Sequence, residues 1–285
     1  MLRLAFILLV VFLCSCASIP EQSLLGLSST MKQELLAQDV ILIGERHDNK
    51  QHHDFQGQVI DFLRSENRLG NIYLEHLNKE RADGLQRTPP STAEQFARTS
   101  RWEESGWPPM EIFSGLFKSL VKGGSLHAVG IDRGVLVELY QGNDPGLIPS
   151  EATQTMNLDK PLPEPQHGRL LNVLLDSHCG QLSTSHGELM LQLQRYRDAY
   201  MALRYEPVPG KIAVYLVGAG HSNKFYGVPQ YLRKLHPNLN LLSIELLERG
   251  SRALSDESDW VISTEPTERK DPCADINIRE PKTKI

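Results

Sequence analysis

Residues 40–55 read VILIGERHDNKQHHDF, an apolar run that ends at a glycine and is followed by three histidines and three acids. The four apolar residues Val40–Ile43 are typical of a buried strand. Phe55, Val59 and Phe62 then recur at helical spacing. The stretch therefore predicts a strand, a polar loop and a helix, with ionisable side chains at the carboxyl end of the strand.

Further apolar runs predict the rest of a sheet. They are Asn71–Leu74, Leu126–Ile131, Ile212–Val217, Leu241–Leu247 and Trp260–Ile262. Helical patterns lie between them, and Ser91-x-x-Glu94 and Ser185-x-x-Glu188 resemble capping boxes that open helices. This alternation predicts an α/β fold: a mainly parallel sheet flanked by helices, with a helical insertion at residues 168–205 before the later strands.

Polar residues follow the predicted strands. They are Gly44-Glu45-Arg46-His47, Glu75-His76, Asp132-Arg133 and Gly218-Ala219-Gly220-His221. Open α/β sheets bind ligands outside the carboxyl ends of their strands. Since two of these segments share a Gly-x-x-His pattern, we expect a functional site at this edge.

Glu45, His47, Glu75 and His221 offer a mixed set of carboxylate and imidazole donors. Such donors suit Zn, Mn or Fe and can leave a position for water or substrate. The structural alternatives are a helix-capping role for Glu45 and loop-fixing hydrogen bonds for the two histidines.

Three other histidines have open roles. His52 shares a helical stripe with Phe55, so a structural histidine and a ligand are equally consistent. His53 points elsewhere and could face the pocket or solvent. His178 either lines the pocket or places a favourable charge near a helix C-terminus.

Tyr196 and Tyr200 lie one turn apart in the predicted insertion helix, on a stripe with Leu189, Leu193 and Leu203. An aromatic stripe of this kind commonly belongs to a core. Alternatively, one phenolate ligates ferric haem, as tyrosinate does in some haem proteins. There is no Cys-x-x-Cys-His for covalent haem attachment, no Walker motif and no Gly-x-Ser-x-Gly elbow.

The chain begins with one Arg and a short apolar stretch, Leu4 to Leu13, which suits an export signal and is too short to span a bilayer. The next residues resemble a bacterial lipobox with Cys16 as the acylated residue; an ordinary signal peptide is the alternative. Ala17, rather than Asp, favours the outer membrane under the usual Gram-negative sorting. We therefore expect residues 1–15 to be a signal peptide and the protein to be a membrane-anchored lipoprotein of the outer membrane.

The expected organisation is a tether at residues 16–35, a single α/β domain at 36–264 and a polar tail at 265–285. A chain of 285 residues with 40% hydrophobic and 23% charged residues is ordinary for a globular protein. Its net charge of -5 gives no reason to expect nucleic acid as a partner. Beyond the signal region Cys179 and Cys273 remain, either as a disulfide or as two thiols.

Several segments together resemble the ChaN-type haem-binding lipoproteins, within a wider group that includes Tiki and TraB-like proteins. They are ILIGERHDNKQHHDFQ, YLEHLN, ESGWPPMEIFSGLF, HCG at 178–180, RDAYMA at 197–202 and LVGAGHSNKFYGVP. They follow the family's order from about residue 40 to 230. The paired Gly-x-x-His elements with Glu75 between them are the most specific part.

The resemblance implies haem and iron acquisition, with ferric haem held by a tyrosine: Tyr200 as first choice and Tyr196 as second. It also implies a homodimer around paired haems and a partner-subunit histidine at the propionates, for which His221 is the leading candidate. An outer-membrane haem receptor would be a further partner. Arg46 departs from the small or uncharged residue expected within the first Gly-x-x-His and could add a propionate-binding charge.

The same resemblance also implies a rival class. Tiki relatives are metal-dependent proteases, and another relative hydrolyses a macrolide lactone. In such a hydrolase a divalent metal or a histidine activates water, and Glu45 or Glu75 acts as general base. A third hypothesis is a scaffold whose site no longer works. We expect haem binding rather than catalysis.

Overall fold

The computed structural model describes residues 22–23, 26–251, 256–271 and 273–274. The predicted signal peptide and lipidation site Cys16 lie outside the described residues. Among the described helices, none has the length and apolarity that crossing a membrane requires.

The centre of the protein is a seven-stranded sheet whose paired strands are all parallel, in the order β1-β7-β6-β2-β5-β3-β4. The predicted α/β fold is confirmed. The strands are β1 (Gln22–Ser23), β2 (Val40–Glu45), β3 (Leu69–Leu74), β4 (Ser125–Ala128), β5 (Ile212–Gly218), β6 (Leu241–Glu248) and β7 (Trp260–Thr264).

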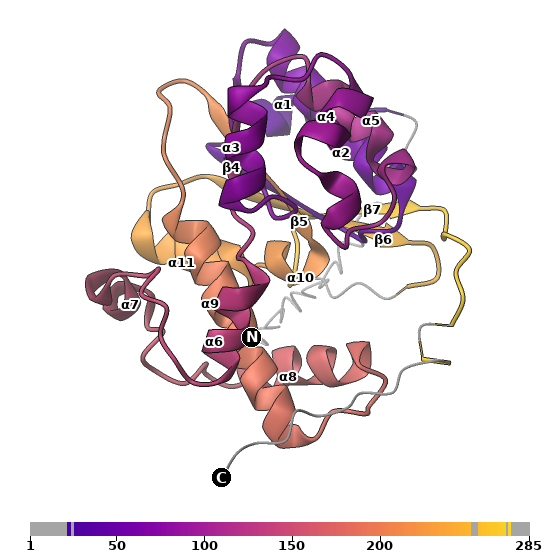
Figure 1. The fold of residues 1–285 in the computed structure, drawn as a ribbon. Helices are drawn as coiled ribbons and strands as arrows, with labels where there is room; N and C mark the ends of the chain where they lie inside the picture. The colour runs from indigo at the N-terminus through magenta and orange to yellow at the C-terminus, as the bar shows by residue number, and fades with distance from the viewer. Residues whose placement is uncertain (1–21, 24–25, 252–255, 272, 275–285) are drawn as a thin grey trace, which may run out of the picture.

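Helices connect the strands and cover both faces of the sheet. They are α1 (Ser29–Leu36), α2 (Lys50–Ser65), α3 (Lys79–Arg87), α4 (Ala93–Thr99), the 3-10 turn η1 (Trp102–Glu104), α5 (Met110–Leu120), α6 (Arg133–Tyr140), α7 (Ser150–Met156), α8 (Gln166–Ser177), α9 (Thr184–Leu203), α10 (Ala219–Ser222) and α11 (Val228–Leu235). Figure 1 shows α2, α4 and α5 on one face and α9 and α11 on the other. The hairpin of α8 and α9 extends away from the sheet.

Side chains that alternate along each strand build two cores. In β2, Ile41 and Ile43 pack with α2 and α5, whereas Val40 and Leu42 pack with α9 and α11. All six residues of β2 are buried. A parallel sheet covered on both faces needs such continuous apolar strands, which is why the sequence signal of β2 was strong.

The predicted strand Leu126–Ile131 is too long, because β4 ends at Ala128. The amide of Gly130 donates to the carbonyl of Leu77 at 2.9 Å, so the chain leaves the sheet edge and follows the turn after β3. A Cβ on Gly130 would lie 2.3 Å from the carbonyl oxygen of Glu75, so this close approach requires glycine.

Two helix starts differ from the predicted capping boxes. Thr92 caps α4 by accepting from the amide of Gln95, and Ser183 caps α9 by accepting from the amide of His186. Ser91 instead binds the side chain of Gln95. In both helices the cap is the extended residue directly before the first turn, which periodicity alone does not locate.

The packed fold extends beyond residues 36–264, the range predicted for the α/β domain. Helix α1 begins within the predicted tether and adds Met31 and Leu35 to the core. On the C-terminal side, a disulfide joins Cys273 to Cys179 at the tip of the α8–α9 hairpin.

Candidate functional site

The carboxyl ends of three neighbouring strands bring the two Gly-x-x-His elements together. Glu45 at the end of β2 pairs in register with Gly218 at the end of β5. On the other side of β5, the amide of Glu75 donates to the carbonyl of Leu216 at 3.2 Å. A Cβ on Gly218 would lie 3.1 Å from the His47 ring and 3.5 Å from the Glu75 carboxylate, so glycine allows both groups to approach.

Glu45 is the centre of the first half of the site. Its Oε1 lies 2.5 Å from Nδ1 of His47 and 3.0 Å from Nε2 of His76, and its Oε2 lies 3.9 Å from Nε2 of His53. Oε2 has no hydrogen-bond partner among the described residues. One donor atom from each of Glu45, His47 and His76 lies within 4.8 Å of the others, so these three could hold a metal ion.

The charges of this half support one another. Burial alone would raise the pKa of Glu45, but the charge of His47 and hydrogen bonds from His47 and His76 lower it to about 2. Burial alone would lower the pKa of His47, but the Glu45 carboxylate raises it. Glu45 is therefore an anion at neutral pH, and His47 is the partner with access to solvent, with its side chain 36% exposed.

Glu75 is the centre of the second half. Its Oε1 accepts from Nη2 of Arg197 at 2.6 Å and lies 3.3 Å from Nε2 of His221. Its Oε2 accepts from the amide of Gly218 at 2.7 Å. On the far side of the imidazole, Nδ1 of His221 lies 2.5 Å from Oδ1 of Asp198 and 2.9 Å from the side-chain Nε2 of Gln194.

The imidazole of His221 is held as a cation. Burial alone would lower its pKa, but Glu75 and Asp198 raise it to about 9. Burial raises the pKa of Asp198 to about 6, against the opposing charges of His221 and Arg197. Although burial opposes ionisation of Glu75, His221 and Arg197 hold its pKa well below the usual value. This half is thus a buried ion network at neutral pH.

Two buried histidines of α2 have structural contacts. His53 has its Nε2 3.0 Å from the carbonyl of His47 and its Nδ1 3.0 Å from Oε1 of Gln56. His52 accepts from the amide of Arg46 at 2.9 Å and contacts Thr264 at 2.9 Å. Both imidazoles have partners at both ring nitrogens, and burial lowers both pKa values. The structural alternative therefore fits His52. His53 does not face solvent: it is fully buried, and its Nε2 lies 3.9 Å from Oε2 of Glu45.

Trp107 forms a wall beside this site. Its ring lies 4.6 Å from that of His47 and 4.7 Å from that of His76, and its Nε1–H donates to the carbonyl of His76 at 3.1 Å.

Helix α9 brings a face to the site that differs from the predicted tyrosine stripe. Its buried residues are Gly187, Leu191, Arg195, Asp198, Ala199, Met201 and Ala202. Tyr196 and Tyr200 are half-buried against the second core, while Leu189 is 36% exposed. The stripe is thus the open flank of α9.

The two tyrosines have different surroundings. Burial and the nearby Asp144 raise the pKa of Tyr196, whose hydroxyl is itself buried. The hydroxyl of Tyr200 makes no hydrogen bond with a residue of the described part. His178 lies elsewhere, at the C-terminal end of α8, with Nδ1 2.7 Å from the carbonyl of Leu174. The structure therefore does not bring His178 into contact with the Glu45 or Glu75 groups.

Sequence reasoning assigned no role to His76, Arg197, Asp198 or Trp107. His76 follows Glu75 directly at a strand end, which was a usable signal. Arg197 and Asp198 follow Gln194 by one helical turn, so the three share a face of α9. The sequence shows this spacing, but it does not show which face of α9 meets the sheet.

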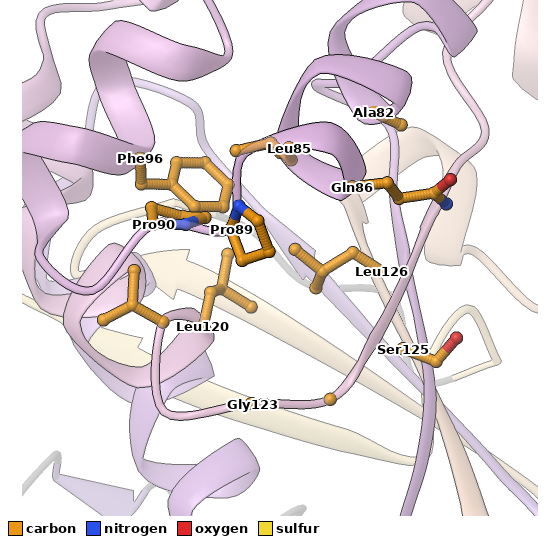
Figure 2. A pocket seen from close by; sticks show the side chains of 12 residues that line it. Ala82, Leu85, Gln86, Pro89, Pro90, Phe96, Leu120, Gly123, Ser125 and Leu126 are labelled. Carbon is orange, nitrogen blue, oxygen red and sulfur yellow. The ribbon is translucent and has the colours of Figure 1, made fainter.

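An apolar hollow lies away from these ionisable groups. It encloses about 270 Å³ at the start of β4, and Leu85, Pro89, Phe96, Leu120 and Leu126 are among its lining residues (Figure 2). Its lining contains no titratable side chain. The buried ionisable groups at the carboxyl edge of the sheet therefore lie apart from this hollow.

Comparison with known proteins agrees with this architecture. The family described as "Haem-binding uptake, Tiki superfamily, ChaN" matches residues 31–232. The structure of cofacial haem binding to ChaN of Campylobacter jejuni superposes with a TM-score of 0.62 at 20% identity, covering 81% of this chain and 89% of that one.

Two more distant structures also align. The type III effector HopBA1 has a TM-score of 0.47 at 13% identity, covering 88% of this chain and 100% of that one. Erythromycin esterase EreC has a TM-score of 0.44 at 15% identity, covering 78% of this chain and 73% of that one. No curated protein matches the sequence significantly. Because the family match spans most of the chain, this protein belongs to the ChaN family of the Tiki superfamily.

Proposed function

We propose that this protein binds ferric haem through Tyr200 and serves haem and iron acquisition as an outer-membrane lipoprotein acylated at Cys16. The observation that carries the proposal is the position of Tyr200. Its side chain is half-buried on α9, one turn from Arg197, and its hydroxyl is not engaged by other described residues. Family membership supports haem as the ligand.

The residues around Tyr200 fit a porphyrin. Leu193 and Tyr196 share its flank of α9, and α6 packs against α9 without burying any of its own residues. The apolar Val137 on α6 is 47% exposed. A broad apolar surface with a phenol that can reach the iron is what a haem face needs; the hydroxyl of Tyr196 also lacks a hydrogen-bond partner among the described residues, but it is buried. Ferric iron, when bound, would favour the phenolate over the phenol, whose ordinary pKa is about 10.

Two arginines at the carboxyl edge of the sheet suit haem propionates. Arg197 is 26% exposed while it contacts Glu75, and Arg46 is 50% exposed at the His47 loop. Guanidinium groups pair well with carboxylates. His221 is only 5% exposed and is already held by Glu75 and Asp198, so Arg197 and Arg46 fit this role better within one subunit.

We further propose that two copies pair through the open faces of α6 and α9 with two haems between them. The cofacial haem described for ChaN of C. jejuni motivates this arrangement. An outer-membrane receptor would then be the supplier of haem.

The test is a titration of the purified full-length chain in detergent with ferric haem, followed by visible absorption. We expect saturation at a fixed ratio, with bands typical of high-spin tyrosinate ligation, and a doubled mass in light scattering on loading. Absence of saturable binding would refute haem carriage. Mass spectrometry of membrane-extracted protein tests diacylation of Cys16, which Cys16→Ser should abolish.

A metal-dependent hydrolase is the second candidate, favoured by the Glu45–His47–His76 cluster. Here the cluster would hold a divalent metal, and Glu75 would be the remaining carboxylate of the site for the role of general base, which requires it to exchange a partner such as Arg197 for water. Metal analysis of protein purified without chelator tests this, with Glu45→Gln and His76→Gln expected to reduce bound metal. Hydrolysis retained in purified Glu45→Gln would remove Glu45 from the mechanism.

A further inference from the structure

After β7 the chain returns to the loop that carries His47. We name residues 265–271 the C-terminal strap. Its Arg269 forms two hydrogen bonds to the Asp48 carboxylate, from Nε at 2.8 Å and Nη2 at 2.9 Å. It forms two more to Glu248, from Nη1 at 2.6 Å and Nη2 at 2.7 Å. One guanidinium thus clamps two carboxylates in bidentate fashion, which is the strongest ion-pair geometry.

The clamp lies at a sheltered place. Glu248 at the end of β6 is 5% exposed. It also accepts from Nδ2 of Asn49 at 2.8 Å and from the amide of Thr267 at 3.0 Å. The Arg269 side chain is 22% exposed and that of Asp48 is 39% exposed, so solvent screens the Asp48 pair more than the Glu248 pair.

The strap backbone adds contacts at the other end of the loop. The amide of Glu265 donates to Oε1 of Gln51 at 3.1 Å, and the carbonyl of Glu265 accepts from Asn49 at 3.0 Å. Asp48 and Asn49 directly follow His47, whose imidazole contacts Glu45. The strap therefore holds the segment that positions this imidazole.

The chain just after the strap is attached to the helical hairpin that contributes to the site. Cys273 forms a disulfide with Cys179 at the tip of the α8–α9 hairpin. Helix α9 of that hairpin supplies Arg197 and Asp198 to the Glu75 half. Three residues lie between Arg269 and Cys273, and the four residue steps can span at most about 14 Å, so the two anchors cannot move far apart.

We propose that Arg269 is a positioning residue of the site, and that the strap, with its disulfide, links the His47 loop to the α8–α9 hairpin so that the bound ligand dissociates slowly. The ligand part rests on the proposed haem binding. A dithiol reductant would open the link: it would donate two electrons and two protons to the disulfide, yield two thiols and become oxidised to its own disulfide.

The test uses the full chain with Arg269→Gln and Arg269→Lys. Lysine keeps the charge but cannot form two bidentate pairs. Amide hydrogen exchange is measured at residues 46–53, and haem dissociation is followed by transfer to an excess of an apoprotein acceptor. We expect at least about tenfold faster exchange and dissociation in Arg269→Gln, with partial rescue in Arg269→Lys. The matched control is Arg249→Gln, since the Arg249–Glu265 pair is exposed and should contribute little.

Dithiol treatment should accelerate haem dissociation in the wild type but have no further effect in the double variant Cys179→Ser, Cys273→Ser. Faster exchange without faster dissociation would overturn the link between strap and ligand. Unchanged exchange in Arg269→Gln would overturn the positioning role itself. If the wild type binds no haem, the proposed function fails, and the exchange of residues 46–53 still decides whether Arg269 positions the loop.

Discussion

Oδ1 of Asp198 lies 2.5 Å from Nδ1 of His221, so a helix of the insertion holds the imidazole of the second Gly-x-x-His element. At the other ring nitrogen, Oε1 of Glu75 lies 3.3 Å from Nε2. All three residues are buried. The insertion is therefore part of the site, because without α9 the His221 cation would lack one of its two anionic partners.

Removing the charge of Asp198 should destabilise the protein. Asp198→Asn leaves the His221 cation next to a neutral amide in a buried network, for which we expect a loss of about 3 kcal/mol in the free energy of unfolding. Urea denaturation measures it. Asp176→Asn on the exposed face of α8 is the control, expected to stay within about 0.5 kcal/mol of the wild type. Equal stability of both variants would contradict the importance of this ion pair.

Stability should fall as the pH rises from about 6.5 through 9. His221 has a folded pKa of about 9 against an ordinary value of 6.5, so the native state binds more protons than the unfolded state in this window. The stabilisation is fully present below pH 6.5 and lost above 9, on the order of 3 kcal/mol. Urea midpoints across this range measure the slope. His221→Gln should flatten the slope; an unchanged slope would assign it to other groups.

The identity of the haem ligand can be read from two matched variants. Tyr200→Phe removes the hydroxyl and keeps the ring, so the ferric haem spectrum should shift and affinity should fall by about tenfold or more, while the fold is retained. Tyr196→Phe should leave the spectrum unchanged, since its hydroxyl is buried. The opposite result, a shift only in Tyr196→Phe, would move the ligand one turn back along α9.

Gly44 should not tolerate a methyl group. A Cβ there would lie 1.9 Å from Oγ of Ser222 and 2.9 Å from Cα of Ala219. We expect Gly44→Ala to cost about 2 kcal/mol or more, and Ser222→Ala to restore only part, because the Ala219 contact is backbone. Gly134→Ala is the control: nothing lies within 4 Å of its added Cβ, so the helix α6 should gain up to about 1 kcal/mol. Thermal denaturation measures the stability of Gly44→Ala, of its combination with Ser222→Ala, and of Gly134→Ala. Equal stability of Gly44→Ala and Gly134→Ala would refute the steric argument.

The sequence by itself determined the α/β class and most strand positions. Runs such as Val40–Ile43 and Ile212–Val217 are apolar throughout, because a parallel sheet covered on both faces buries every residue of its central strands. It also indicated the site edge. Polar residues that directly follow parallel strands gather at the same end of the sheet whatever the strand order is.

Only the tertiary structure decided which of these groups meet. Strand β5 lies between β2 and β3, and at the carboxyl ends of these strands Glu45 at the end of β2 contacts His76 after β3, while Glu75 contacts His221 after β5. Periodicity carries no information on strand order. It likewise could not tell which side of α9 faces the sheet, since the stripe of Tyr200 and the stripe of Asp198 both have helical spacing. Packing turns the Asp198 stripe toward the sheet. Only on that side do Arg197 and Asp198 reach the buried charges of Glu75 and His221.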